Sequence, residues 1–574
     1  MFRGTLYAGV YAMKDKRKGA GGRKSPVLYI VMLSVWSLLC AAIWYYFVPA
    51  FITPPFAAGT GGNLALRIFA VVLLVLNALF ISYFWLNGVK DFLYVMWYTF
   101  SRRKLEAKYR KVLETDVRSV SDKVLMLYCT CNDFDGESLR RSMRQTYAHA
   151  ETVILDDSSQ PEYKEKVDAF ARETGVRVVR RADRKGFKAG NINHFLQSEE
   201  VRRSDYGYVV ILDSDEIIPP DFIVSCLRYF YAYENVGIVQ ANHVATRNRN
   251  FFMKLFHIGV NSHWPTYQTM KHNYGFSSML GHGAMIRREC YEQAGGFPDL
   301  VAEDLCLSIE MRNKGYVVAF APDIVCEEEY PVDYAAFKKR HSKWTQGNLE
   351  FIKKYTGKIF RSRMRWFEKL DIILFTYNLP LTAIFAFYII LNIVILPVIG
   401  VDVGRVYPLW MIVPTVVFFF SPMLNDVFTW LFRINIFRFL FYLLCVVVLY
   451  GSMLFTSLVS ALLGMFGKKA KFIVTPKDSQ KMGFLRALRI QWKELMFSTV
   501  LVAVSLVFVR TFLPVVLIAV TGYLSFALLF FANKKYSAEQ TRRIDARTFA
   551  VSAKQNGLYF SGSAFGRAKS APEH

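Results

Sequence analysis

Long apolar runs stand on both sides of a polar block in this chain. Two runs precede the block, at Val27–Ile52 and Leu64–Leu86, and only the second carries a charge, at Arg67. Each is long enough to cross about 30 Å of hydrocarbon as a helix. The pattern therefore predicts a multi-pass α-helical membrane protein. Five further runs follow the block, at Asp371–Gly400, Val406–Leu424, Ile436–Phe466, Met496–Arg510 and Pro514–Ala532.

Charges at the ends of these runs predict the orientation. The loop Thr53–Asn63 is uncharged, whereas basic residues precede the first run, and such residues stay on the cytoplasmic side. The N-terminus and the polar block are therefore expected in the cytoplasm. A cytoplasmic segment 468–493 requires an even number of crossings between it and Arg365, whereas three apolar runs lie there. One of the three is therefore expected to lie along the interface or to kink without crossing. The run Ile436–Phe466 is ambiguous, and about six crossings are expected in all. The basic residues are Lys14, Lys16, Arg17, Lys18, Arg23 and Lys24.

Composition agrees with a membrane protein. Hydrophobic residues make up 53% of the chain, and the formal net charge is +25. Basic residues gather beside apolar runs, as at 102–104 and 361–365, which favours a lipid bilayer over nucleic acid as the partner of this charge. The eight cysteines indicate neither a disulfide framework nor zinc binding, because only Cys129 and Cys131 are closely spaced.

The pattern changes to alternating strand and helix between residues 99 and 370. Short apolar runs predict strands, and charged amphipathic stretches such as 137–145 and 162–174 predict the helices between them. This alternation is typical of a mostly parallel α/β sheet that binds ligands at the carboxyl ends of its strands. The predicted strands are Val124–Tyr128, Val153–Leu155, Val176–Val179, Tyr208–Leu212 and Val236–Gln240.

Polar clusters follow four of these strands. Asp213 and Asp215 end the strand Tyr208–Leu212, and side chains at i and i+2 point the same way, so both carboxylates can reach one divalent ion. Oxygen ligands favour Mg²⁺ or Mn²⁺ carrying a phosphate, although a solvated strand end is the alternative. The other clusters are Thr130, Asn132 and Asp133; Asp156 and Asp157; and Lys188 to Asn191. Together they outline a nucleotide pocket.

The order of these motifs resembles the membrane-embedded processive glycosyltransferases of family 2, which include cellulose and hyaluronan synthases. The resemblance implies an α/β GT-A-type (Rossmann-like) catalytic domain inserted between transmembrane helices of the plasma (inner) membrane. In that family an acidic pair like Asp156–Asp157 contacts uracil, and a K-A-G-N motif like Lys188–Asn191 binds the donor. Asp213 and Asp215 match the metal-holding D-x-D motif.

Glu303 and Asp304 match the family's T-E-D motif, with Ala302 in place of the threonine. The resemblance places the general base at Asp304, and a carboxylate suits this role because it can take the proton of the acceptor hydroxyl. A helix N-cap pair is the alternative. Direct displacement with a single base inverts the anomeric carbon, so an α-linked donor gives a β-linked product.

Two motifs concern the acceptor. Lys343 and Trp344 stand at the family's Q-x-x-R-W, with lysine for arginine, so Lys343 is expected near the diphosphate and Trp344 against the terminal sugar ring. Packing at the membrane face is the alternative for Trp344. Gly281 and His282 begin a G-H-x-A sequence similar to bacterial periplasmic glucan synthases, which favours glucose. His282 is expected either at the acceptor or as a buried structural histidine.

The segment 472–477 resembles the gating loop of cellulose synthases, with Thr475 and Lys477 expected to reach the donor phosphates. This similarity favours a UDP donor. The tail 533–574 is polar and basic, and is expected to be disordered.

The sequence as a whole favours an inverting, processive synthase. It would polymerise a β-glucan from UDP-glucose with Mg²⁺ or Mn²⁺, pass the polysaccharide through the membrane, and work with export partners. A non-processive transferase that adds one sugar to a lipid is the alternative, and a transporter with a vestigial domain is less favoured. The expected divisions are 1–98, 99–370, 371–467, 468–495, 496–532 and 533–574.

Overall fold

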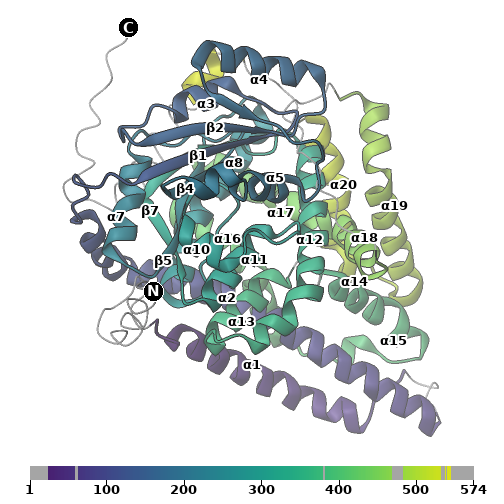
Figure 1. Ribbon diagram of the computed structural model, residues 1–574. Helices are drawn as coiled ribbons and strands as arrows, with labels where there is room; N and C mark the ends of the chain where they lie inside the picture. Colours follow the sequence, from purple (N-terminus) through teal and green to yellow (C-terminus); the bar gives the residue numbers. More distant parts are fainter. Residues whose placement is uncertain are drawn as a thin grey trace.

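The computed structural model describes residues 24–57, 63–378, 382–467, 482–531, 537 and 539–544. An α/β domain built around one sheet lies beside a group of long helices (Figure 1). In that view α1 (Val27–Ile52) and α2 (Leu64–Leu113) run along the lower edge, and α19 (Phe484–Val509) and α20 (Val516–Phe531) stand on the right. The α/β domain and the apolar helices therefore lie side by side, with α2 belonging to both.

The sheet has seven strands in the order β3-β2-β1-β4-β6-β5-β7. All pairs are parallel except those of β6, which runs antiparallel to β4 and β5. The five predicted strands are confirmed, whereas β6 and β7 were not predicted. The strands are β1 (Lys123–Thr130), β2 (Ala150–Asp156), β3 (Arg177–Val179), β4 (Tyr206–Asp213), β5 (Val236–Ala245), β6 (Ala284–Arg287) and β7 (Val317–Glu328).

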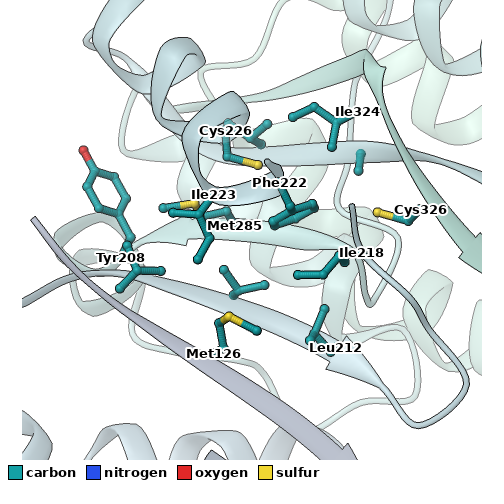
Figure 2. Packing of buried hydrophobic residues seen from close by; sticks show 14 of the residues in the cluster. Met126, Tyr208, Leu212, Ile218, Phe222, Ile223, Cys226, Met285, Ile324 and Cys326 are labelled. Atoms are coloured by element: carbon teal, nitrogen blue, oxygen red, sulfur yellow. The ribbon is translucent and has the colours of Figure 1, made fainter. Parts of the chain in front are cut away.

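Both faces of the sheet are buried, which explains the continuous apolar runs in the middle of β1 and β4. Alternate residues of β1 enter different cores: Met126 belongs to one cluster, and Leu125 and Leu127 belong to the other. In the first core, Phe222 and Cys226 of α7 (Phe222–Ala232) pack over the sheet (Figure 2). The second core is covered by α5 (Phe187–Leu196), α10 (Arg288–Ala294) and α11 (Glu303–Asn313).

The remaining helices of this block connect the strands or lead to the apolar helices. They are α3 (Gly136–Ser142), α4 (Pro161–Thr174), α6 (Glu199–Arg203), α8 (Phe251–His263), η1 (Trp264–Gln268), α9 (Thr269–Tyr274), α12 (Tyr334–Arg361) and α13 (Trp366–Thr376). The expected boundary at residue 99 lies within α2, because this helix continues without interruption to Leu113.

Six helices in the described ranges are long and apolar enough to cross a membrane. The run Asp371–Gly400 yields none of them, because it is divided among α13, α14 (Thr382–Ile390), η2 (Leu391–Ile395) and α15 (Leu396–Val398). The ambiguous run forms one long apolar segment of α17 (Ile436–Gly451) and α18 (Met453–Met465). The six segments are Val27–Ile52, Leu64–Leu105, Leu409–Trp430, Ile436–Met465, Phe484–Val509 and Leu513–Phe530. In the same order, they are formed by α1; by α2 up to Leu105; by η4 (Leu409–Met411) with α16 (Ile412–Trp430); by α17 with α18; by α19; and by η5 (Leu513–Val515) with α20.

Candidate active site

The polar clusters after β1, β2 and β4 lie at one edge of the sheet. The strand register pairs Thr130 with Asp156 and Cys129 with Asp213, so the carboxyl ends of the three strands are level. Parallel strands bring their carboxyl ends to the same edge, which is where α/β sheets bind ligands. The structure therefore brings together the clusters that the sequence predicted to form one pocket.

The polar residues after β1 form hydrogen bonds that connect the loops at this edge of the sheet. Thr130 donates a hydrogen bond to Asp133 Oδ1 over 3.0 Å, and Ser214, between the two aspartates of the D-x-D, donates to Asp133 Oδ2 over 2.7 Å. Asn132 adopts a left-handed backbone conformation and accepts two backbone N–H bonds from Ser159 and Gln160 at 2.9 Å each. These contacts hold the loops after β1, β2 and β4 in fixed relation.

Two arginines after β3 bind the acidic pair after β2. Arg180 Nε donates to Asp156 over 2.7 Å, and Arg181 forms a two-pronged bond with Asp157 over 2.9 and 2.7 Å. Arg181 also donates to the carbonyl oxygens of Lys185 and Phe187, at the start of α5. Neither arginine belongs to a motif predicted from the sequence, although an Arg-Arg pair directly after a predicted strand was a usable signal. Bidentate guanidinium bonds fix a carboxylate strongly, so these contacts set where the acidic pair lies.

Lys188 connects α5 to the D-x-D. Its ammonium group forms an ion pair with Asp213 and donates to the carbonyl oxygen of Gly281 over 2.8 Å. Burial disfavours the charged form of Lys188, but the attraction of the Asp213 carboxylate is stronger. The pKa of Lys188 therefore lies above its usual range. Burial likewise opposes ionisation of Asp213, yet Lys188 and His282 lower the pKa of this carboxyl. Asn191, three residues on, is buried, and its Oδ1 has no hydrogen-bond partner among the described residues.

Asp213 ends β4, and Asp215 lies in the turn that follows this strand. Both residues are only partly buried, and the carboxylate of Asp213 forms an ion pair with the ammonium group of Lys188. An all-oxygen donor set of two carboxylates suits Mg²⁺ or Mn²⁺ that shares its remaining positions with phosphate and water. When bound, such an ion would offset negative charge on a diphosphate.

Glu303 and Asp304 form the first turn of α11 beside this edge. The N-cap residue is Ala302, so neither carboxylate is itself the N-cap, and Asp304 Oδ1 accepts the backbone N–H of Leu305 over 2.7 Å within the first turn. Burial, followed by the repulsion of Asp304, raises the pKa of Glu303 to about 8, and burial also raises the pKa of Asp304. A Cβ on Gly281 would lie 3.5 Å from Asp304 Oδ2, and this glycine has φ +92°. The pair is thus held against the loop that also contacts Lys188.

Lys343 and Trp344 lie on α12. Burial lowers the pKa of Lys343, and the carboxyl groups of Glu303 and Asp213 oppose this shift. The ammonium group of Lys343 therefore belongs to one charge cluster with Glu303, Asp213 and Lys188. Trp344 is 48% exposed, and the guanidinium of Arg340 lies 4.7 Å from its ring centroid. Consecutive helix residues project about 100° apart, so Trp344 leaves α12 on a different face from Lys343.

His282 lies in a charge cluster with residues that the sequence analysis missed. Its Nδ1 is 3.3 Å from Glu216 Oε1, and His243 Nε2 is 2.9 Å from the same oxygen. Burial opposes protonation, but Glu216 and Asp213 raise the pKa of His282 to about 10. Glu216 directly follows the D-x-D and His243 lies in a strand, so neither stood out as part of a motif. Thr475 and Lys477 lie outside the described residues.

Comparisons with known proteins identify the family of this domain. A family model described as "Glycosyl transferase family group 2" matches residues 208–467, which include the D-x-D, the Glu303–Asp304 pair and α12. The chain therefore contains a family 2 glycosyltransferase domain with a GT-A-like sheet, and this domain is homologous to plant glucomannan mannosyltransferases.

Two curated relatives illustrate this homology. Probable glucomannan 4-beta-mannosyltransferase 15 of Arabidopsis thaliana is 25% identical over 253 residues, covering 42% of this chain and 47% of the relative. Glucomannan 4-beta-mannosyltransferase 1 of Cyamopsis tetragonoloba is 26% identical over 214 residues, covering 36% and 40%. The chain thus spans less than half the length of these relatives. Among solved structures, a mannosyltransferase from Pyrobaculum calidifontis in complex with GDP-Man and Mn²⁺ is 18% identical, with 66% of this chain and 100% of that chain covered and a TM-score of 0.38.

Proposed function

We propose that this protein is an inverting, processive glycosyltransferase that polymerises a β-linked polysaccharide and passes it across the membrane. One observation carries the proposal: Lys188, Asp213, Asp304 and Lys343 converge at the carboxyl edge of a family 2 sheet in a chain with six candidate membrane helices. The catalytic domain is expected at the cytoplasmic face of the plasma membrane, because basic residues flank the first helices.

The charge cluster supports direct displacement. Asp304 takes the proton of the acceptor hydroxyl while the acceptor oxygen bonds to the anomeric carbon and the bond from that carbon to the diphosphate breaks. The electron pair of the broken bond leaves with the nucleoside diphosphate. Lys188 and Lys343 supply positive charge next to the leaving group, and Asp213 and Asp215 would hold Mg²⁺ or Mn²⁺ there. Attack from the side opposite the leaving group gives a β-linked product from an α-linked donor.

Two donors are supported by different observations. The G-H-x-A sequence and the resemblance of the segment 472–477 favour UDP-glucose, whereas the names of the plant relatives favour a mannosyl donor such as GDP-mannose. A base contact at Asp157 would suit either nucleotide, because its two oxygens accept from Arg181 but keep further lone pairs for a base N–H. We propose UDP-glucose as the donor and GDP-mannose as the second candidate.

Purified full-length protein in lipid nanodiscs tests the activity. UDP-glucose, UDP-N-acetylglucosamine, UDP-glucuronate and GDP-mannose are supplied separately with Mg²⁺ or Mn²⁺, and nucleoside diphosphate release is recorded. Digestion of the product with linkage-specific hydrolases then identifies sugar and bond. Polymer from UDP-glucose supports the glucan proposal, polymer from GDP-mannose replaces it with a mannan synthase, and no release from any donor contradicts both.

Product length separates the processive enzyme from a transferase that adds one sugar to a lipid. The double variant Thr475→Ala with Lys477→Ala is expected to reduce polymer yield severely, because a loop that closes over the diphosphate excludes water at each addition. A monodisperse elution profile in detergent controls for folding. If this variant makes polymer of wild-type amount and length, the segment 472–477 acts only as a linker between helices. If wild type makes single-sugar lipid products, the non-processive alternative is favoured.

A further inference from the structure

Glu216, His243 and His282 form a compact cluster behind the D-x-D. Glu216 lies in the turn after β4, His243 lies on β5, and His282 lies in the loop before β6. The side chains of Glu216 and His243 are completely buried, and that of His282 is 18% exposed. Three chain segments that are distant in sequence thus direct two imidazoles and one carboxylate to one point.

The distances in this cluster match those between ligands of one small cation. His243 Nε2 and His282 Nδ1 lie 2.9 and 3.3 Å from Glu216 Oε1, and one ligand atom from each residue lies within 4.8 Å of the others. Donor atoms at about 2.0–2.1 Å from a tetrahedral metal ion lie about 3.3 Å from one another. Only a small movement of the side chains is therefore needed to receive an ion.

The surrounding contacts orient the same atoms. Glu216 Oε2 accepts the backbone N–H of Gly283 over 2.9 Å, which fixes the carboxylate with Oε1 toward both imidazoles. His282 Nδ1 is buried without a hydrogen-bond partner among the described residues, although it lies beside Oε1. Its other ring nitrogen is 3.7 Å from Glu328 Oε2. Metal-binding histidines commonly have such a carboxylate behind the ring.

Gly283 leaves room for the cluster. Its φ is +56°, and a Cβ there would lie 2.2 Å from Glu216 Oε1 and 2.3 Å from His243 Nε2. The loop can therefore pass directly over the two ligand atoms only because this position has no side chain.

We infer that Glu216, His243 and His282 bind a divalent transition-metal ion, with Zn²⁺ as the preferred ion. Two imidazoles and one carboxylate suit Zn²⁺, whereas Mg²⁺ prefers oxygen ligands alone. The site is therefore chemically distinct from Asp213 and Asp215. The ion joins the turn after β4 to the loop 281–283, whose Gly281 carbonyl accepts from Lys188, and it stabilises the floor of the donor pocket.

Metal analysis of the purified full-length protein tests this site without any assay of activity. Wild type prepared without added metal is expected to contain about one Zn²⁺ per chain by mass spectrometry. After removal of zinc with a chelator, titration with Co²⁺ is expected to give the visible absorption of a tetrahedral cobalt site. Both results on wild type are independent of how any variant folds.

Variants then locate the metal. His282→Ala is the main variant because its partly exposed side chain is the least needed for the core, and Glu216→Gln is the second. Both are expected to weaken Zn²⁺ binding at least about 100-fold, since each loses a direct ligand. Asp215→Asn and His194→Ala, an exposed histidine on α5, are expected to bind as wild type. Wild type without zinc and without a cobalt spectrum, or undiminished zinc in both His282→Ala and Glu216→Gln, would overturn the inference.

Discussion

The Glu303–Asp304 pair makes a quantitative prediction about pH. Burial, followed by the repulsion of Asp304, raises the pKa of Glu303 from 4.5 to about 8, so Glu303 is mostly protonated at neutral pH. The elevation corresponds to a cost of about 5 kcal/mol for ionising Glu303 here, relative to a carboxyl group in water. Ionised Glu303 would attract Lys188 and Lys343, whose charges are needed at the diphosphate. Activity is therefore expected to require protonated Glu303.

The size of the effect follows from the titration of one group. With a pKa of about 8, protonated Glu303 falls from about nine-tenths of the molecules at pH 7 to about one-tenth at pH 9. The wild-type kcat/KM is thus expected to fall about tenfold over this range. Glu303→Gln keeps a neutral hydrogen-bonding side chain that cannot titrate. Its profile should be flat from pH 7 to 9.

The assay is nucleoside diphosphate release at subsaturating donor between pH 6 and 9.5. Glu289→Gln, at an exposed position on α10, is the matched control and should keep the wild-type decline. Asp304→Asn should lose about 10² to 10⁴ of the rate at every pH while still binding the nucleotide, because it removes the base. A wild-type profile without a decline, or the same decline in Glu303→Gln, would refute the assignment of this titration to Glu303.

Three further outcomes are expected. Asp215→Ala should abolish the gain in nucleotide affinity that Mg²⁺ or Mn²⁺ provides, and unchanged affinity by calorimetry would contradict the hard-cation site. Arg181→Ala leaves the buried Asp157 unpaired and should destabilise the protein by about 3–5 kcal/mol, seen as a lower melting temperature in detergent. Gly283→Ala should lower the melting temperature and zinc content, whereas Gly315→Ala, also at positive φ but without neighbours within 4 Å, should retain its zinc.

The sequence predicted the parallel part of the sheet because each of those strands is a continuous apolar run. It missed β6, since Ala284–Arg287 is only four residues long and its partners come from distant segments. It also missed β7, where Asp323 and two terminal glutamates interrupt the apolar pattern of Val317–Glu328. Periodicity identifies a strand from its own residues, whereas short or interrupted strands are decided by the neighbours that they meet in the fold.

The same distinction applies to the site. Asp213, Lys188 and Asp304 could be predicted because each belongs to a compact motif, and the structure places all three in one charge cluster. Glu216 and His243 could not, because 27 residues separate them and only the register of β5 beside the turn after β4 makes them neighbours. The sequence also did not show that Asp156 and Asp157 are bound to arginines. An ion pair between the loop after β2 and the loop after β3 depends on how both loops run, which the sequence of either one does not reveal.

The length of α2 has a mechanical consequence. This helix has 50 residues, which is about 75 Å of continuous helix, against about 30 Å for the hydrocarbon of a bilayer. Its last turns enter the core of the α/β domain, where Tyr109 and Val112 pack with Val124 of β1. One continuous helix therefore joins a segment that is long and apolar enough to cross a membrane to the first strand of the sheet. Helices adjust their tilt to bilayer thickness, so in a membrane a change in lipid composition is expected to change the height of the sheet above the bilayer.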